Sequence, residues 1–582
     1  NYNVAIGDYT MDSALDGATY NTAIGFSALS GITTGDHNTT LGYKAGFGLT
    51  TGVYNVIIGS QAGDAASIGN YNVLIGAFAG SSINTGDADG TVAIGYNAGA
   101  VLTSGIGSTA IGYEALKTAT DNDYNTAVGN RALYSISGSS GTEGEGNTAV
   151  GRYAGYSTTT GNSNIFVGNQ AGFSNTTGIY NNFIGNAAGN SSTTANQNTY
   201  IGWYAAYYQQ VGGNNVAIGH QTLYGASGKA NSASENVVIG YQSAMGSDVG
   251  EGLTAVGSRA LRNVSDSGSY STAIGYFSGF HASGSYNTFV GAEAGKGGTT
   301  SAPYSSGQYN TAIGYESLKG FTTGGNNIAI GYQASVSLTT ATMTITMGYL
   351  AGNSITTGGS NIMIGREAGK NITTTTSNVI IGNRAGMHLG GSNSDNHANR
   401  NVIIGHNAGR GDNGPSIAKG HYSVVIGDQA QYYFKSGSQN VHMGYQSGYY
   451  NQNGNYNVTI GSNAGARATG SSNTFIGYRA GFGGNSSAPY SSGGDNTALG
   501  YEALNGFTTG YQNVAIGYEA GESITTGYYN TLMGYEAGEK LTTGFGNVFM
   551  GYEAGASKIV NIGSIAIGYR AGLPSAGSYD VF

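Results

Sequence analysis

One glycine recurs along the whole chain at a nearly constant distance, and this period limits the possible folds more than any other feature. The glycine follows an aliphatic residue 32 times between Gly7 and Gly568, and 20 of the 31 intervals are 17 residues long. A short fixed period is typical of a solenoid, in which one small unit is stacked on copies of itself. We therefore predict a single continuous repeat array at 1–572, followed by a C-terminal tail at 573–582.

Numbered from this glycine as position 0, the three preceding residues have the character of a buried strand. Position −1 is Ile, Val, Leu or Met in all 32 units, and we interpret it as a core position. Position −3 shares its face and is usually Thr or Val, whereas position −2 points the other way and is also mostly apolar, as in Phe183 and Ala515. A strand that is apolar on both faces is expected to be covered on both faces.

A second apolar anchor stands at position +7 in about a third of the units. Examples are Ile32, Leu49, Leu102, Phe321, Leu338, Ile355, Ile372, Phe507, Ile524 and Leu541. Two anchors that divide the period nearly in half predict two short strands per coil. The aliphatic residue at every sixth position that a three-sided hexapeptide helix needs is absent. The predicted fold is all-β, a parallel β-roll solenoid of about 32 coils.

Three further positions have a structural interpretation. Asn occupies position −4 in 25 of the 32 units, and stacked Asn side chains can bond to one another along a column. The glycine at position 0 allows a positive φ or a close approach of two backbones. Position +3 is always Ala, Ser or Thr, which indicates tight packing.

Positions +1 and +2 carry aromatic and charged residues. Tyr occupies position +1 in 15 units, where it would form either a carbohydrate- or protein-binding surface or an aromatic seam between subunits. Position +2 carries much of the charge, and Glu519, Glu536 and Glu553 would stack on one another. Like charges in a column are destabilising unless they reach solvent, so we predict a solvent-exposed edge at position +2.

Composition excludes several classes of protein. Charged residues are 9% of the chain, the net charge is −9, and the 21 Lys and Arg are scattered, so no basic stripe exists for a nucleic acid. Cysteine is absent, which excludes disulfides and thiolate metal sites. No apolar run is long enough to cross a bilayer, so we expect no membrane insertion. Because the chain starts at Asn1, we expect a fragment of a longer protein.

Six intervals between successive glycines are longer than the rest, and such insertions form loops, where recognition is often located. The loops at 302–306 and 488–492 are identical, and they belong to near-duplicate blocks around 271–352 and 457–538. The duplication is either a repeated binding element or shared ancestry. The candidate receptor-contact residues in the loops are Pro303, Tyr304, Pro489, Tyr490 and Pro415.

The sequence contains no recognisable catalytic or metal-binding set. The eight His residues show no metal-ligand spacing, and no Ser-His-Asp set or pair of carboxylates recurs in one context. Acidic turns such as Asp121-Asn122-Asp123 lack the remaining ligands of a calcium loop. We therefore expect no cofactor, no metal and no enzymatic activity.

The block Asn-Val-Ala-Ile-Gly-Tyr-x-Ala-Gly at 513–521, with variants at 21–28, 327–334 and 564–572, resembles the repeat of trimeric autotransporter adhesin heads. It is similar also to repeats of bacteriophage tail fibres. The resemblance implies a left-handed β-roll, a homotrimer and a role in attachment. The usual adhesin repeat is shorter than the repeat of this chain, and the neck, coiled-coil stalk and membrane anchor that follow it in the family are not visible here.

The leading hypothesis is thus an extracellular attachment fibre on a cell surface or virion, which binds a glycan or protein receptor. An alternative is a structural filament or matrix protein whose rods join end to end. A third is ice binding by the Thr-Thr pairs that follow the +7 anchor, as at 33–34 and 525–526, although a flat Thr array would be interrupted at many coils.

Overall fold

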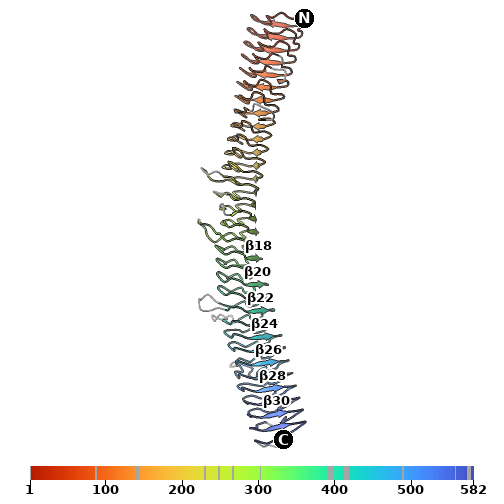
Figure 1. Ribbon diagram of the computed structural model, residues 1–582, viewed down its shortest axis with the longest axis vertical. Coiled ribbons are helices and arrows are strands. Elements are labelled where there is room, and N and C mark those ends of the chain that lie inside the picture. The colour runs from red at the N-terminus through yellow and green to blue at the C-terminus, as the bar shows by residue number, and fades with distance from the viewer. Residues whose placement is uncertain are drawn as a thin grey trace. The chain divides into compact units, whose positions relative to one another are not determined.

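A computed structural model describes residues 2–67, 69–84, 88–137, 143–227, 231–246, 249–264, 268–301, 303–390, 398–411, 419–487, 490–557, 559–572 and 578–581. It is an all-β parallel solenoid with one coil for each repeat of the sequence, as predicted. The chain divides into two compact units, Asn1–Tyr286 and Asn287–Phe582, both built from the same coil. In each unit the strands are stacked along one side and the turns lie on the other (Figure 1).

Each coil contributes one strand of three residues, which ends immediately before the repeating glycine. The strands of the first unit are β1 Val4–Ile6, β2 Thr22–Ile24, β3 Thr39–Leu41, β4 Val56–Ile58, β5 Val73–Ile75, β6 Val92–Ile94, β7 Thr109–Ile111, β8 Thr126–Val128, β9 Thr148–Val150, β10 Ile165–Val167, β11 Asn182–Ile184, β12 Thr199–Ile201, β13 Val216–Ile218, β14 Val237–Ile239, β15 Thr254–Val256 and β16 Thr272–Ile274. Those of the second unit are β17 Thr288–Val290, β18 Thr311–Ile313, β19 Ile328–Ile330, β20 Ile345–Met347, β21 Ile362–Ile364, β22 Val379–Ile381, β23 Val402–Ile404, β24 Val424–Ile426, β25 Val441–Met443, β26 Val458–Ile460, β27 Thr474–Ile476, β28 Thr497–Leu499, β29 Val514–Ile516, β30 Thr531–Met533, β31 Val548–Met550 and β32 Ile565–Ile567.

Neighbouring strands pair in parallel at identical coil positions, so that Val514 lies beside Thr531 and Ile516 beside Met533. The prediction of a second strand in each coil is wrong. On the opposite side of the coil, successive turns are joined by backbone hydrogen bonds, such as the one from Thr525 N–H to the Thr542 carbonyl at 2.9 Å. Among the described residues, this side forms only isolated β-bridges and no regular strand. Left-handed residues recur at positions +2 and −5, where Glu519 has a φ of 51° and Tyr529 one of 58°, so the chain outside the strand bends before a regular ladder can form.

The strand points its middle residue into the solenoid, and this corrects the assignment of position −1 to the core. Position −2 is buried, as at Phe183 and Ala515, whereas position −1 is exposed in several coils, for example by 44% at Leu499. Positions +3 and +7 face inward as predicted, because Ala520 and Ile524 pack with Ala515 in one core cluster. The core of each coil thus consists of positions −2, +3 and +7.

Positions −2 and +7 divide one fixed space between them. Where position −2 is Phe183 or Phe475, position +7 is the small Ser192 or Gly484; where position −2 is Ala498, position +7 is Phe507. Protein interiors are close-packed, so a phenylalanine at one position is met by a smaller residue at the other, whereas two aliphatic side chains such as Leu532 and Leu541 fit together. This exchange of volume accounts for the missing apolar +7 anchor in coils such as those of Phe183 and Phe475.

The polar column at position −4 forms as predicted. The Oδ1 atom of Asn496 accepts hydrogen bonds from the backbone N–H of Asn513 at 3.0 Å and from its Nδ2 at 3.1 Å. The same Nδ2 donates to the carbonyl of Gly527 at 2.8 Å, which ties the turn to the strand. Each buried amide is therefore satisfied by its neighbours in the column.

The repeating glycine is required both by its conformation and by the next coil. Gly517 has a φ of 137°, and a Cβ atom added there would lie 2.3 Å from the carbonyl oxygen of Gly534. Any other residue would be strained and would push two coils apart.

Candidate functional site

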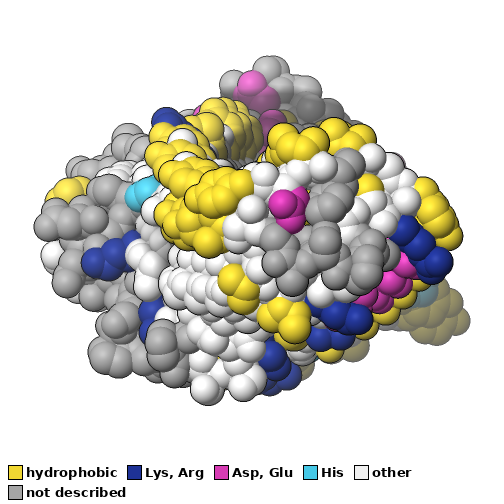
Figure 2. Space-filling view, turned by 90° about the horizontal axis from the view of Figure 1, so that it is seen from below, with side chains coloured by type: hydrophobic (Ala, Val, Ile, Leu, Met, Phe, Trp, Pro, Cys, Tyr) yellow, Lys and Arg dark blue, Asp and Glu magenta, His cyan; other side chains and the backbone are white. Residues whose placement is uncertain are grey.

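The outward side chains of the strands form a surface without charge, which we call the strand face and define as positions −3 and −1. The chain holds 21 Lys and Arg and 30 Asp and Glu, yet none occupies either position in any of the 32 strands. Exposed members include Ile184 in the first unit and Ile313 and Leu499 in the second. Figure 2 shows hydrophobic side chains following one another in rows along the molecule. A repeated, exposed apolar row is typical of a surface that is covered in an assembly.

Tyrosine rings at position +1 stack along one border of the strand face. The rings of Tyr501, Tyr518, Tyr535 and Tyr552 succeed one another at 5.0, 5.0 and 4.9 Å, and all four residues are exposed. The hydrogen bond from Tyr518 to Glu519 raises the pKa of Tyr518 to about 12. The stacked rings cover one another's faces, which supports a packed border.

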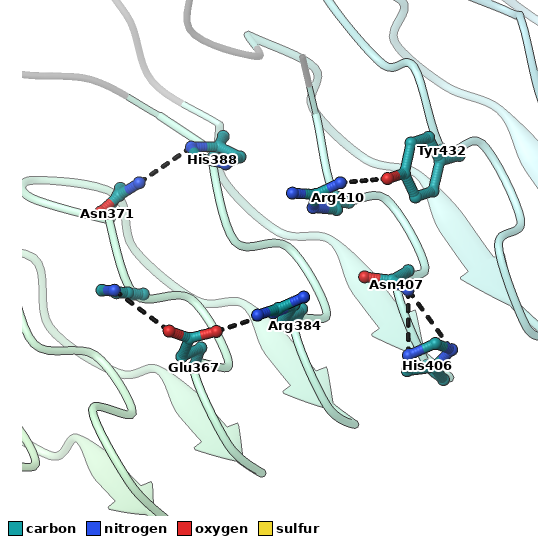
Figure 3. Close-up of polar contacts among 9 residues, drawn as sticks. Glu367, Asn371, Arg384, His388, His406, Asn407, Arg410 and Tyr432 are labelled. Carbon is teal, nitrogen blue, oxygen red and sulfur yellow. Dashed lines mark hydrogen bonds and ion pairs between the residues drawn. The ribbon is translucent and has the colours of Figure 1, made fainter. Parts of the chain in front are cut away.

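Charged and aromatic side chains gather at positions +2, +5 and +6, which we call the turn face. Figure 3 shows Glu367 between two cations, with its Oε2 2.8 Å from Arg384 Nε and its Oε1 3.1 Å from Lys370 Nζ. These hydrogen bonds, led by the one from Arg384, lower the pKa of Glu367. Nearby, Asn371 Nδ2 lies 2.8 Å from His388 Nδ1, and Arg410 bonds to the hydroxyl of Tyr432.

The predicted solvent-exposed edge at position +2 is more buried than expected. Glu367 is only 6% exposed and Glu114 5%, because the next coil covers each carboxylate and offers it a cation. Where Glu follows Glu without a cation between them, as from Glu502 to Glu536, the carboxylates are half-buried.

The predicted receptor-contact residues separate into two groups. Pro303 is exposed, Tyr304 is half-buried, and Tyr490 packs its ring on Tyr450 at 4.1 Å. Pro415 and Pro489 lie outside the described residues. Tyr304 and Tyr490 belong to different coils, so the structure does not bring the predicted loops together in one site.

A groove next to the second loop was not predicted. It has a volume of about 430 Å³ and is lined by Arg467, Arg479, Phe482, Asn505, Glu522 and Thr525, together with glycine backbone. These residues come from four successive coils at positions that vary along the array, so no local motif identifies them. The available signal was the change of these positions between two blocks whose loops are identical.

The threonines that directly follow the +7 anchor form a column in which hydroxyls are hydrogen-bonded to the next coil. The hydroxyl of Thr508 donates to the Thr525 carbonyl at 3.0 Å, and that of Thr525 donates to the Thr542 carbonyl at 3.2 Å. These hydroxyls stabilise the solenoid by linking successive coils.

Across the described part of the chain, no three His, Asp or Glu side chains lie close enough together to hold a metal ion. Nor does this part contain a helix that is long and apolar enough to cross a membrane. Neither a protein-family model nor a curated protein matches the sequence.

Proposed function

We propose that this chain is a subunit of a non-enzymatic extracellular attachment fibre, in which three copies associate through their strand faces and the turn faces remain outward. The observation that supports this most is the absence of charge from the strand face in all 32 coils of a chain with charged residues elsewhere in every region. Solvent-facing strand positions are normally polar, and burial of each aliphatic side chain is worth about 1.5–3 kcal/mol.

The resemblance to trimeric adhesin heads and phage tail fibres supports the number of copies, the left-handed coil and the location on a cell surface or virion. The solenoid is suited to this role because each coil holds its neighbours at a fixed spacing, which separates a binding site from its point of anchorage. The turn face, with its variable side chains and inserted loops, supports recognition of a receptor.

Sedimentation equilibrium of the purified chain tests the assembly. We expect a mass three times the 59.0 kDa of one chain, together with fibres of limited length in electron micrographs. A stable single chain would refute the proposal, and filaments of unlimited length would favour the structural filament instead.

Attachment itself is tested by binding of the chain to a panel of cells and glycans. The informative variant lacks residues 298–308 and 484–494. Loss of binding on deletion would place recognition in the loops, and unchanged binding would place it elsewhere on the fibre.

A further inference from the structure

We infer that the groove between Arg467 and Glu522 binds an acidic saccharide, that is, a sugar chain bearing carboxylate or sulfate groups. This inference rests on the proposed attachment function and names the chemistry of the receptor. Three observations support it: a guanidinium without an ion pair, the contrast with the matching positions of the near-duplicate block, and the length and polarity of the groove.

Both arginines of the groove place their guanidinium groups over the same aromatic ring, but only one of them forms an ion pair. The guanidinium carbons of Arg467 and Arg479 each lie 4.6 Å from the centre of the Phe482 ring. Arg479 is neutralised, because its Nη1 lies 2.9 Å from Glu502 Oε1. Arg467 forms no ion pair with any carboxylate of the described residues. Phe482 therefore positions one guanidinium that is free to bind a carboxylate or sulfate through two parallel hydrogen bonds.

The near-duplicate block contains the same backbone earlier in the chain, with Gly298 at the place of Gly484. The N–H of Gly298 donates to the Phe321 carbonyl at 2.7 Å, and that of Gly484 donates to the Phe507 carbonyl at 2.7 Å. A buried serine hydroxyl also accepts from the loop backbone in both blocks. The two loops are thus held by matching contacts.

The side chains at the matching positions form a closed set of ion pairs in the earlier block. Glu293 and Lys296 replace Arg479 and Phe482, and Lys319 replaces Asn505. Glu293 lies 3.2 Å from Lys296 and 2.7 Å from Lys319, which in turn lies 2.7 Å from Glu316. Two carboxylates and two ammonium groups neutralise one another there. The same scaffold therefore leaves a cation available in the later groove only.

The form of the later groove suits an extended polar ligand. Arg467 and Glu522 belong to coils three steps apart, which is about 14 Å at the spacing of paired strands. Asn505 lies between the ends, and Ser523 lies beside Glu522 in the last coil. Phe482 is the apolar side chain of the lining and its ring is covered by the two arginines, so an anchoring side chain of a protein finds no apolar pocket there. Burial raises the pKa of Glu522, helped by Glu519 and Glu502, and its carboxyl oxygens can accept hydrogen bonds from sugar hydroxyls.

Binding of the assembled full-length chain to immobilised polysaccharides tests the inference. The probes are polysialic acid for carboxylate, heparin for sulfate, dextran as a neutral sugar, and poly-glutamate as a carboxylate of protein origin. We expect binding to polysialic acid or heparin and none to dextran or poly-glutamate. Arg467→Gln should weaken binding about tenfold or more, because a charge-assisted hydrogen bond is lost.

Lys296→Gln is the matched control, since it alters a cation within the closed set of ion pairs of the earlier block. It should bind like the unaltered chain. Four results would each overturn the inference. The Arg467→Gln variant could bind the polysaccharide as strongly as the unaltered chain, or Lys296→Gln could lose as much affinity as Arg467→Gln. The unaltered chain could bind poly-glutamate as strongly as the acidic polysaccharides, or it could bind neither polysialic acid nor heparin.

The outcome is separable from that of the proposed function. A trimeric chain that attaches to cells equally well with Arg467→Gln would retain the function and remove the saccharide groove. A chain that sediments as single copies and attaches to no cell would remove the function, whatever the polysaccharides show.

Discussion

On the strand face, positions −3 and −1 are uncharged in all 32 coils, whereas the turn face of the same coils carries the ion pairs, the arginine–aromatic contacts and the groove. Both faces are built with one period and one backbone, so secondary structure does not explain the difference. A side chain on the strand face meets the same restriction in every coil. A side chain on the turn face varies from coil to coil, as Lys296 and Phe482 do at matching positions.

This difference indicates a division of roles within one coil. A restriction that is repeated in every coil is expected where a continuous partner surface covers the chain. Variation is tolerated where only local contacts must be satisfied, and it is there that one block can acquire an available guanidinium while its duplicate does not. The following experiments challenge this division, beginning with the largest expected effect.

Charge placed on the strand face should abolish assembly. The double variant Ile516→Lys with Met533→Lys is expected to weaken association by about 3–6 kcal/mol per chain, because two buried apolar side chains are lost. Sedimentation equilibrium measures the change, and circular dichroism verifies that the solenoid remains. Glu519→Lys with Glu536→Lys changes charge on the turn face of the same coils, and these chains should still associate. Equal dissociation of both variants would contradict the division.

The glycine between the two faces should tolerate no side chain. Gly517→Ala is expected to lower the free energy of unfolding by about 3 kcal/mol, since its Cβ would meet the Gly534 carbonyl at 2.3 Å in a strained conformation. Gly568 has a φ of 132° with no atom within 4 Å of its added Cβ, so Gly568→Ala measures the conformational strain alone. Thermal unfolding of both variants gives the two losses in free energy of unfolding, and their difference is the cost of the steric clash with the next coil. Equal losses would show that this clash is unimportant.

The coil of β25 should weaken in acid, independently of either face. His442 occupies position −2, its Nδ1 lies 2.5 Å from the Thr459 hydroxyl, and burial lowers its pKa to about 3. The unfolded chain takes up a proton below about pH 6.5 while the folded coil does not, so stability falls as pH decreases, by about 2 kcal/mol at pH 5.

Hydrogen exchange of the β25 amides at pH 7 and pH 5, corrected for intrinsic rates, measures this change. His442→Phe restores a residue type that occupies position −2 in other coils, such as Phe475, and should remove the pH dependence. An unaltered pH dependence in this variant would assign it to another group.

Single ion pairs on the turn face should matter least. Arg384→Gln leaves Glu367 with Lys370 alone and should cost about 1 kcal/mol or less, because the arginine is partly exposed. The contribution of the pair is present above the ordinary pKa of Glu367 and is lost as pH falls, since that pKa is lowered in the folded coil. The loss is measured by thermal unfolding and compared with that of Arg366→Gln, because Arg366 forms no ion pair in the described residues. A loss well above about 1 kcal/mol would make the turn face as restrictive as the strand face.

Much of the coil could be predicted from the sequence, because the same residues recur at the same positions. The Asn column, the glycine with positive φ, the small +3 residue and the inward +7 residue were all predicted. The direction of the strand was predicted wrongly, because three consecutive apolar residues such as Val514-Ala515-Ile516 do not show which face is inward. Position −1 faces outward and is uniform, whereas the inward position −2 varies in size with the residue at position +7, as Ala515 does with Ile524.

The candidate groove could not be predicted because its residues are distant in sequence and individually ordinary. Arg467 is at position +6 of one coil, Phe482 at +5 of the next, and Glu522 at +5 two coils later. Only the stacking brings them to one surface. The prediction of loops from insertion length named Tyr490, which interacts with Arg467 of this groove, but none of the side chains that line it.

The shared volume of positions −2 and +7 has a consequence for how such a chain can lengthen. Each coil completes its own cross-section, as Phe475 does with Gly484 and Ala498 with Phe507, so a coil needs no matching change in distant coils. Whole blocks can then be copied within the gene and still fold, as the near-identical segments around 271–352 and 457–538 illustrate. After copying, each block is free to change its surface residues separately, so growth of the array and diversification of its binding chemistry can proceed together.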